Sequence, residues 1–182
     1  APERATSQYI LTSWQRADGL PQNSVLDVLQ SRTGYLWIAT QDGLARFDGL
    51  TFTVFNTVTD PALGTDDFSA LLEDRHGTLW IGTVGGGVLT FRDGVLEPMS
   101  SLGLSTAIVT DLYEEPDGTL WVATLDGLAR RAGTTVTMFT TAQGLPSNSV
   151  QAVTRDPEGD VWVATEGGVA RLRAGAVSRV IA

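Results

Sequence analysis

Hydrophobic residues recur along this chain in short blocks that repeat about every 41–43 residues. Each unit holds a near-continuous apolar run centred on a tryptophan, as in GYLWIATQDGLARF, GTLWIGTVGGGVLTF, GTLWVATLDGLARR and GDVWVATEGGVARL. The tryptophans are spaced by 43, 41 and 41 residues and are Trp37, Trp80, Trp121 and Trp162. A repeat of this length built from short strands is typical of one blade of a β-propeller. The pattern therefore predicts an all-β chain with four blades.

Four short strands can be placed in each unit. The first is an apolar run that ends at a glycine-closed turn (SRTG, DRHG, EPDG or DPEG), and the second holds the tryptophan. The second strand is apolar at nearly every position, which is typical of a strand covered on both faces. A third strand and an outer fourth strand complete an antiparallel meander. The blades are predicted at residues 23–56, 66–99, 107–140 and 148–181 of one propeller domain, or part of one, over residues 1–182.

The four tryptophans are predicted to lie between blades rather than to bind a ligand. Two residues after each tryptophan the chain carries a small residue, which leaves room for a neighbouring blade. These small residues are Ala39, Gly82, Ala123 and Ala164. We therefore interpret the tryptophans as buried structural core.

The ends of the chain suggest an open rather than a closed ring. Residues 9–14 (YILTSW) are similar to the outer strand that precedes the last blade, so an additional outer strand is predicted there. Four blades are at the low end of what closes a propeller, and open ends would expose apolar surface and strand edges. We expect part of a larger ring, either a fragment of a longer chain or one completed by a second copy in a homodimer.

The charge balance excludes one class of partner. The net charge is 12 − 21 = −9, and an acidic surface repels phosphate backbones, so no nucleic acid is expected to bind. No apolar run approaches the roughly 20 residues that span a bilayer. Attachment to a membrane is therefore expected only through segments outside these residues.

Few residue types in this chain suit catalysis or metal binding. There is no cysteine and no lysine, and the one histidine, His76, lies in a predicted turn. We predict no catalytic residue, no metal site and no cofactor. Two alternatives stay open: Asp27 and Asp111, at equivalent innermost-strand positions, could act as an acid–base pair, and Asp66 with Asp67 could bind calcium.

Polar side chains gather in two sets of loops that the meander places on one face. One set leads into the first strands, and the other joins the second and third strands. Variable loops on a rigid scaffold commonly bind ligands, although Asn, Ser and Asp also cap turns, which is the simpler interpretation for each residue taken separately. The candidate ligand-binding residues are Asn23, Ser24, Asp42, Asp66, Asp67, Asp126, Asn148, Ser149 and Glu166.

The repeat consensus G-L-P-x-N-S-V followed by D-x-x-G-x-L-W-I-G-T-x-x-G-L-x-x-F resembles the two-component regulator propeller repeat of bacterial sensors. Residues 19–25 and 144–150 match its first part closely, whereas the second and third units read ALGTDDF and GLSTAIV there. The resemblance implies a periplasmic sensor domain of an inner-membrane protein, without chemistry of its own. The output implied is a histidine kinase or diguanylate cyclase outside this segment. Relatives recognise carbohydrate-derived ligands, so the implied partner is a small molecule, with carbohydrate as one candidate, or a protein.

Two other functions are compatible with the sequence. Some propellers of related repeat type are lyases or glycosidases, and an enzyme of that kind would have to use channel carboxylates. A protein-interaction platform without a small ligand is the other alternative, and the residues hardly separate it from a sensor.

Overall fold

A computed structural model describes residues 11–173 and 175–181, and this part of the chain forms four antiparallel sheets of four strands each. Blade 1 contains β1 (Val25–Gln30), β2 (Leu36–Thr40), β3 (Gly43–Phe47) and β4 (Phe52–Phe55). Blade 2 contains β5 (Phe68–Glu73), β6 (Leu79–Thr83), β7 (Val88–Arg92) and β8 (Val95–Pro98). Blade 3 contains β9 (Val109–Glu114), β10 (Leu120–Thr124), β11 (Gly127–Ala132) and β12 (Thr135–Phe139). Blade 4 contains β13 (Val150–Arg155), β14 (Val161–Thr165), β15 (Gly168–Arg173) and β16 (Ala176–Ile181).

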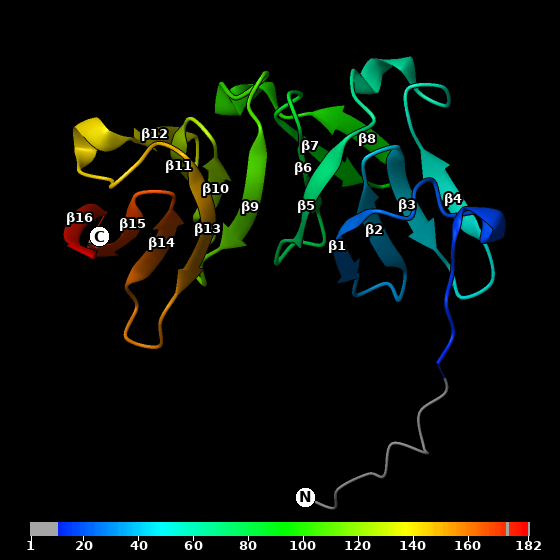
Figure 1. Cartoon of the computed structure of the whole chain (residues 1–182), viewed down its shortest axis with the longest axis horizontal. Helices are drawn as coiled ribbons and strands as arrows, with labels where there is room; N and C mark the ends of the chain where they lie inside the picture. Colours follow the sequence, from blue (N-terminus) through cyan, green and yellow to red (C-terminus); the bar gives the residue numbers. More distant parts are fainter. Residues whose placement is uncertain (1–10, 174, 182) are drawn as a thin grey trace, which may run out of the picture.

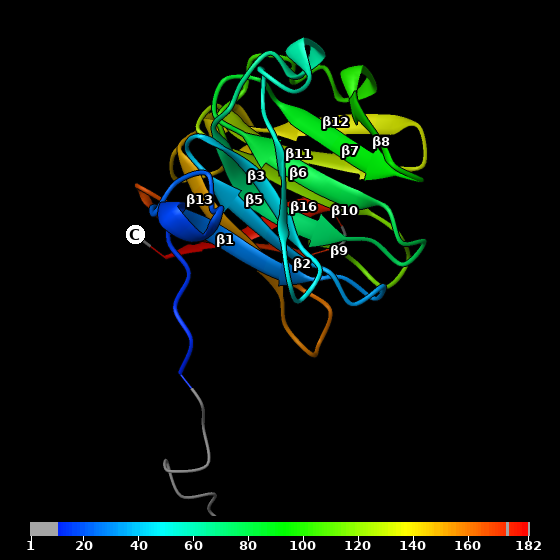
Figure 2. The ribbon, with the colours of Figure 1, turned by 90° about the vertical axis from the view of Figure 1, so that its right-hand side faces the viewer.

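The four blades follow one another as an open arc, with the blue and red ends of the chain on opposite sides (Figure 1). Within each blade the strands are ordered as they occur in the sequence, so each blade is a meander. The first strands of neighbouring blades contact one another, which places β1, β5, β9 and β13 innermost. Seen from the side, the sheets overlap face to face (Figure 2). The predicted all-β architecture of propeller blades in part of a larger ring is confirmed.

Single turns of 3-10 helix lie in the loops that lead into the first strands. They are η2 (Arg16–Asp18), η3 (Pro61–Leu63), η4 (Ser100–Leu102) and η5 (Thr141–Gln143). In the described residues none of the helical segments is long and apolar enough to cross a membrane. The turns between first and second strands close on glycines with left-handed backbone, for example Gly34 with φ of 90° and Gly118 with φ of 93°. Only glycine adopts that conformation at little cost, which explains the repeated position.

Three hydrophobic clusters hold the blades together, one at each blade interface. Trp37, Trp80 and Trp121 are 3%, 5% and 1% exposed, and each packs against the innermost two strands of the following blade. The blades approach so closely that a Cβ added to Gly82 would lie 2.5 Å from Cγ1 of Val109. The prediction that small residues admit the neighbouring blade therefore has a direct steric basis at this interface.

The prediction of four buried tryptophans is wrong for Trp162, which is only half-buried. The tryptophan side of each earlier blade faces the next blade, but no further blade follows β16 in the described residues. At the opposite end of the arc Val28 is 51% exposed, although Leu71 at the equivalent position of blade 2 is buried. The two open ends of the arc therefore both expose apolar residues. They differ because blade 1 exposes the face that in later blades receives the preceding blade, which we call the leading face. Blade 4 exposes the face that carries the tryptophan, which we call the trailing face.

The additional outer strand predicted over residues 9–14 is not formed by residues 11–14, and Tyr9 and Ile10 lie outside the described residues. Here β4 already occupies the outer position of blade 1. Trp14 instead packs its ring on Phe47, with the ring centroids 5.2 Å apart. This ring contact holds Trp14 against blade 1 without the backbone hydrogen bonds that would make residues 11–14 a strand.

Candidate functional site

The loops that lead into the first strands and the loops between second and third strands share one face, which we call the loop face. Backbone hydrogen bonds of 2.9–3.2 Å join the two sets within blades 2, 3 and 4. They run from Val84 N to Asp67 O, from Leu125 N to Ile108 O, and from Glu166 N to Ser149 O. The loop face predicted from the meander is therefore present, and in these three blades its two sets of loops are joined by backbone hydrogen bonds.

Asn23 and Asn148 cap turns. Their Oδ1 atoms accept hydrogen bonds from the backbone N–H of Arg16 (2.9 Å) and Thr141 (2.8 Å) respectively. These bonds close the loops of the two G-L-P-x-N-S-V segments, which begin at Gly19 and Gly144 in left-handed conformation. The asparagines are thus explained by loop structure.

Two more of the predicted residues are engaged within the protein. Both carboxylate oxygens of Asp66 accept hydrogen bonds from Thr57, one from its backbone N–H and one from its hydroxyl. The Ser149 hydroxyl oxygen accepts a bond of 3.0 Å from Gln151. Asp66 is therefore engaged by Thr57, and the described residues contain no group of three or more His, Asp or Glu placed to hold a metal ion. Ser24 is exposed on the loop face.

Asp42 and Asp67 approach each other across the interface between blades 1 and 2. Asp42 lies on the turn between β2 and β3, and Asp67 immediately precedes β5. Burial raises the pKa of Asp67, and the negative charge of Asp42 raises it further. One oxygen of Asp67, Oδ1, is buried without a hydrogen-bond partner. Gln22 donates a hydrogen bond of 3.2 Å to Asp42 and so fixes the second carboxylate.

The equivalent position between blades 3 and 4 lacks this pair. Asp126 occupies the same turn as Asp42, because its N–H is bonded to Thr124 (3.1 Å) as that of Asp42 is bonded to Thr40 (3.3 Å). However, the residue that corresponds to Asp67 in blade 4 is Ser149. Asp126 and Glu166 are exposed. A hollow of about 250 Å3 also opens on the loop face, beside Gly64 and Gly86, but none of the predicted residues lines it.

Asp27 and Asp111 link neighbouring blades. Oδ2 of Asp27 accepts the Leu71 N–H at 2.7 Å, and Oδ2 of Asp111 accepts the Val153 N–H at 2.8 Å. The other oxygen of each carboxylate accepts the N–H of the following residue in its own strand. Burial raises the pKa of Asp111. Since all four oxygens are bonded to backbone, these residues serve the blade interfaces and are poorly placed to exchange protons with a substrate.

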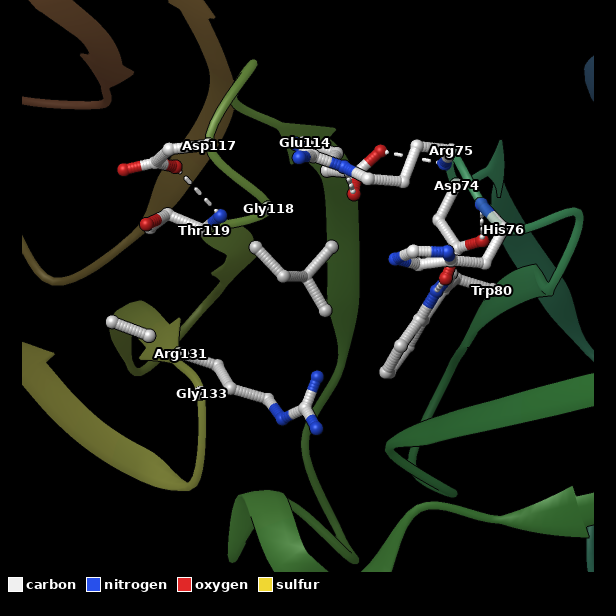
Figure 3. Close-up of a pocket in the computed structure, with 12 residues that line it drawn as sticks. Asp74, Arg75, His76, Trp80, Glu114, Asp117, Gly118, Thr119, Arg131 and Gly133 are labelled. Carbon is white, nitrogen blue, oxygen red and sulfur yellow. Dashed lines mark hydrogen bonds and ion pairs between the residues drawn. The ribbon is translucent and has the colours of Figure 1, made fainter.

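Sequence reasoning missed the opposite face, which we call the turn face. It holds the turns between first and second strands and between third and fourth strands. Between blades 2 and 3 it opens into a cleft of about 480 Å3, lined among others by His76, Trp80, Glu114 and Arg131 (Figure 3). The available signal was the residue Arg131, which stands where the other blades carry Phe or Leu.

Comparison with solved structures gives extracellular domains of bacterial two-component and one-component systems among the similar folds. The extracellular domain of BT3049 from B. thetaiotaomicron, assigned as a hybrid two-component system, has a TM-score of 0.76 at 23% identity, over 87% of this chain and 22% of that chain. The extracellular domain of BT4673 from the same organism, assigned as a one-component system, has a TM-score of 0.77 at 22% identity, over 92% and 24%. Virginiamycin B lyase from Staphylococcus aureus is also similar, with a TM-score of 0.66 at 14% identity, over 88% and 56%. At these identities the likeness shows the fold.

Sequence comparisons are more specific. Histidine kinase P4 of Formosa agariphila is 45% identical over 49 residues, which are 27% of this chain and 4% of that protein. This chain therefore spans only a small part of that relative. The family described as "Two component regulator propeller" matches residues 19–42, 62–85, 103–126 and 144–167. Because these four matches cover more than half of the sequence, the chain belongs to the two-component regulator propeller family.

Proposed function

We propose that this chain is the ligand-sensing input domain, or part of it, of a bacterial signal-transduction receptor. The family and the likeness to extracellular domains of such systems support a sensor role. The ligand is a small molecule or a partner bound on the loop face, and the signal passes to a kinase or cyclase domain outside this segment. The match to a histidine kinase supports a kinase as the output.

The observation that carries the proposal is the unpaired oxygen of Asp67. A buried acceptor without a partner costs free energy, about 1–3 kcal/mol in proteins, unless a donor reaches it. A ligand hydroxyl or ammonium group would supply that donor once the Asp67 side chain turned outward to meet it. Asp42, held by Gln22, would accept from a second donor of the same ligand. The site thus fits a molecule rich in hydroxyl or amine groups, and carbohydrate is one such class.

We place the domain in the periplasm. Two of the similar solved structures are extracellular domains, and the ligand of a receptor of this type would arrive from outside the cell. An enzymatic role is not proposed, since the carboxylate oxygens of Asp27 and Asp111 all accept backbone hydrogen bonds. One oxygen of each is bonded to the neighbouring blade and the other to its own strand.

Thermal unfolding of this chain with a library of neutral sugars, polyols and amines tests the proposal. A binding compound is expected to raise the melting temperature of the wild type and of Asp126→Asn, but not that of Asp67→Asn. Asp126→Asn is the control because it removes one loop-face carboxylate of the same charge, at a position equivalent to Asp42 where no second carboxylate faces it. Equal shifts in all three proteins, or no shift with any compound, would contradict a ligand site at Asp67. A shift with calcium alone that Asp67→Asn abolishes would replace the organic ligand with a cation.

A further inference from the structure

Each blade interface forms a cleft on the turn face, and the three clefts differ in size. The volumes are about 310 Å3 between blades 1 and 2, about 480 Å3 between blades 2 and 3, and about 160 Å3 between blades 3 and 4. The same backbone architecture builds all three, so the difference arises from side chains.

The cleft between blades 2 and 3 is the largest of the three because an arginine stands where blades 2 and 4 carry a hydrophobic side chain. In blades 2 and 4 the equivalent third-strand position holds Phe91 and Leu172, which pack into the interface in front of them. Phe91 lies on Trp37, with the ring centroids 4.8 Å apart. In blade 3 this position is Arg131, and its guanidinium carbon lies 5.5 Å from the ring centroid of Trp80.

Blade 2 also differs from the other blades at the third-strand residue opposite its tryptophan. In blades 1, 3 and 4 the residue directly across from the tryptophan is an arginine of the same blade, and its guanidinium lies over that tryptophan. In blade 2 the residue across from Trp80 is Thr90. The cation over Trp80 therefore comes from the following blade and stands in the cleft. A neighbouring hollow of about 450 Å3, lined by Thr90 and Arg92, is also lined by Trp80 and Arg131.

The other charges beside this cleft are engaged within the protein. Arg75 donates to Glu114 at 2.9 Å. Asp74 accepts hydrogen bonds from the Trp80 indole (2.9 Å) and from the backbone N–H groups of His76 and Thr78. Arg131 forms no hydrogen bond or ion pair with any described residue, although its side chain is half-buried. Figure 3 shows it reaching across the cleft toward Trp80 and His76.

We propose that this cleft is a binding site for a small organic monocarboxylate. The planar guanidinium of Arg131 would take the carboxylate through two parallel hydrogen bonds, the geometry for which arginine is suited. The body of the ligand would lie on Leu120 and the edge of Trp80, and the His76 imidazole would complete the polar wall. A dianion such as phosphate fits less well, because the cleft also holds the carboxylates of Glu114 and Asp117. This site lies on the face opposite the one proposed for sensing and does not depend on it.

Two-dimensional 1H–15N NMR of this chain tests the site with acetate, lactate and benzoate as probes. At least one probe is expected to give saturable shifts of the Trp80 indole N–H and of the Arg131 Nε–H. Benzamide, which has the shape of benzoate without its charge, should shift neither, and inorganic phosphate should shift them less.

Arg131→Leu supplies the residue that blade 4 has at this position and so preserves the packing. It is expected to weaken binding of the probe by roughly 10-fold or more, the effect of losing a charge-assisted hydrogen bond. Arg130→Leu, which removes a neighbouring arginine that lies over Trp121 instead, is the matched control and should bind as the wild type does. Unchanged binding in Arg131→Leu, or no saturable shift with any of the three carboxylates, would overturn the proposal.

Discussion

Replacement of Trp121 by alanine tests how much one blade interface stabilises the protein. The indole is 1% exposed and fills the space between blades 3 and 4, with Phe139 beside it at a ring-centroid distance of 5.7 Å. Its Nε1–H donates to Glu115 at 2.7 Å, and the Arg130 guanidinium lies over its face. The substitution therefore removes apolar burial, a hydrogen bond to a carboxylate and a cation–π contact together.

The expected loss is at the upper end of the usual range for a buried aromatic residue. Truncation of a buried tryptophan to alanine costs about 3–5 kcal/mol. Glu115 keeps a second partner, because Arg155 lies 3.4 Å from its other oxygen, so the lost hydrogen bond adds little to that range. We expect a decrease in the free energy of unfolding of about 4–5 kcal/mol. Trp162→Ala is the internal comparison, and its half-buried indole should cost only about 1–3 kcal/mol.

Urea unfolding followed by circular dichroism gives both values at one temperature. Equal losses in the two variants would show that Trp162 is as well covered as Trp121, which would require a further blade or a second copy on the open face. A loss below about 1 kcal/mol for Trp121→Ala would refute the assignment of this indole to the interface core, since surface substitutions usually stay within about 0.5 kcal/mol.

Three other predictions concern close contact, acid and association. Gly82→Ala is expected to lower the free energy of unfolding by about 1–3 kcal/mol in the same urea experiment, because the added methyl group would collide with Val109; an unchanged midpoint would contradict the steric argument. A hydrogen bond from Arg173, with help from a second arginine of β15, lowers the pKa of Asp160 from 3.8 to about 2. Because the folded state favours the charged carboxylate, the contribution of Asp160 to the free energy of unfolding is complete above about pH 4 and is lost as the pH falls toward 2. Unfolding followed against pH should therefore show that Asp160→Asn is less sensitive to acid than the wild type between these pH values. Light scattering is expected to show self-association of this chain through its open ends, and Val28→Glu should abolish it; a clean monomer of the unsubstituted chain would contradict this.

The blades could be predicted from the sequence because their determinants are local. A tryptophan strand, a turn that closes on glycine and a small residue two positions after the tryptophan act within one unit. The burial of a side chain, in contrast, is not determined within one unit, as Trp162 shows. Its surroundings in the sequence match those of Trp121, yet its exposure depends on whether a further blade follows.

The candidate sites were harder to predict because they lie between units. Asp42 and Asp67 were each named from the loop pattern, but nothing in the sequence indicated that these two, rather than Asp66 or Asp126, come together. Their proximity depends on how blade 2 is placed against blade 1. Arg131 was not among the candidate residues named from the sequence. Its significance appears only when the register aligns it with Phe91 and shows Trp80 beneath it.

The unlike faces of each blade give this architecture a direction, and that direction has a genetic consequence. A gene segment that encodes one blade carries a leading and a trailing face, so its tandem duplication would insert a blade that already fits both neighbours. The contents of the new interface would nevertheless depend on which blade was copied. If blade 2 were duplicated, the copied Phe91 would cover Trp80 as it now covers Trp37, and the new interface would contain a filled core. Arg131 would then lie over the tryptophan of the copy, so the cleft would survive one blade further along the chain.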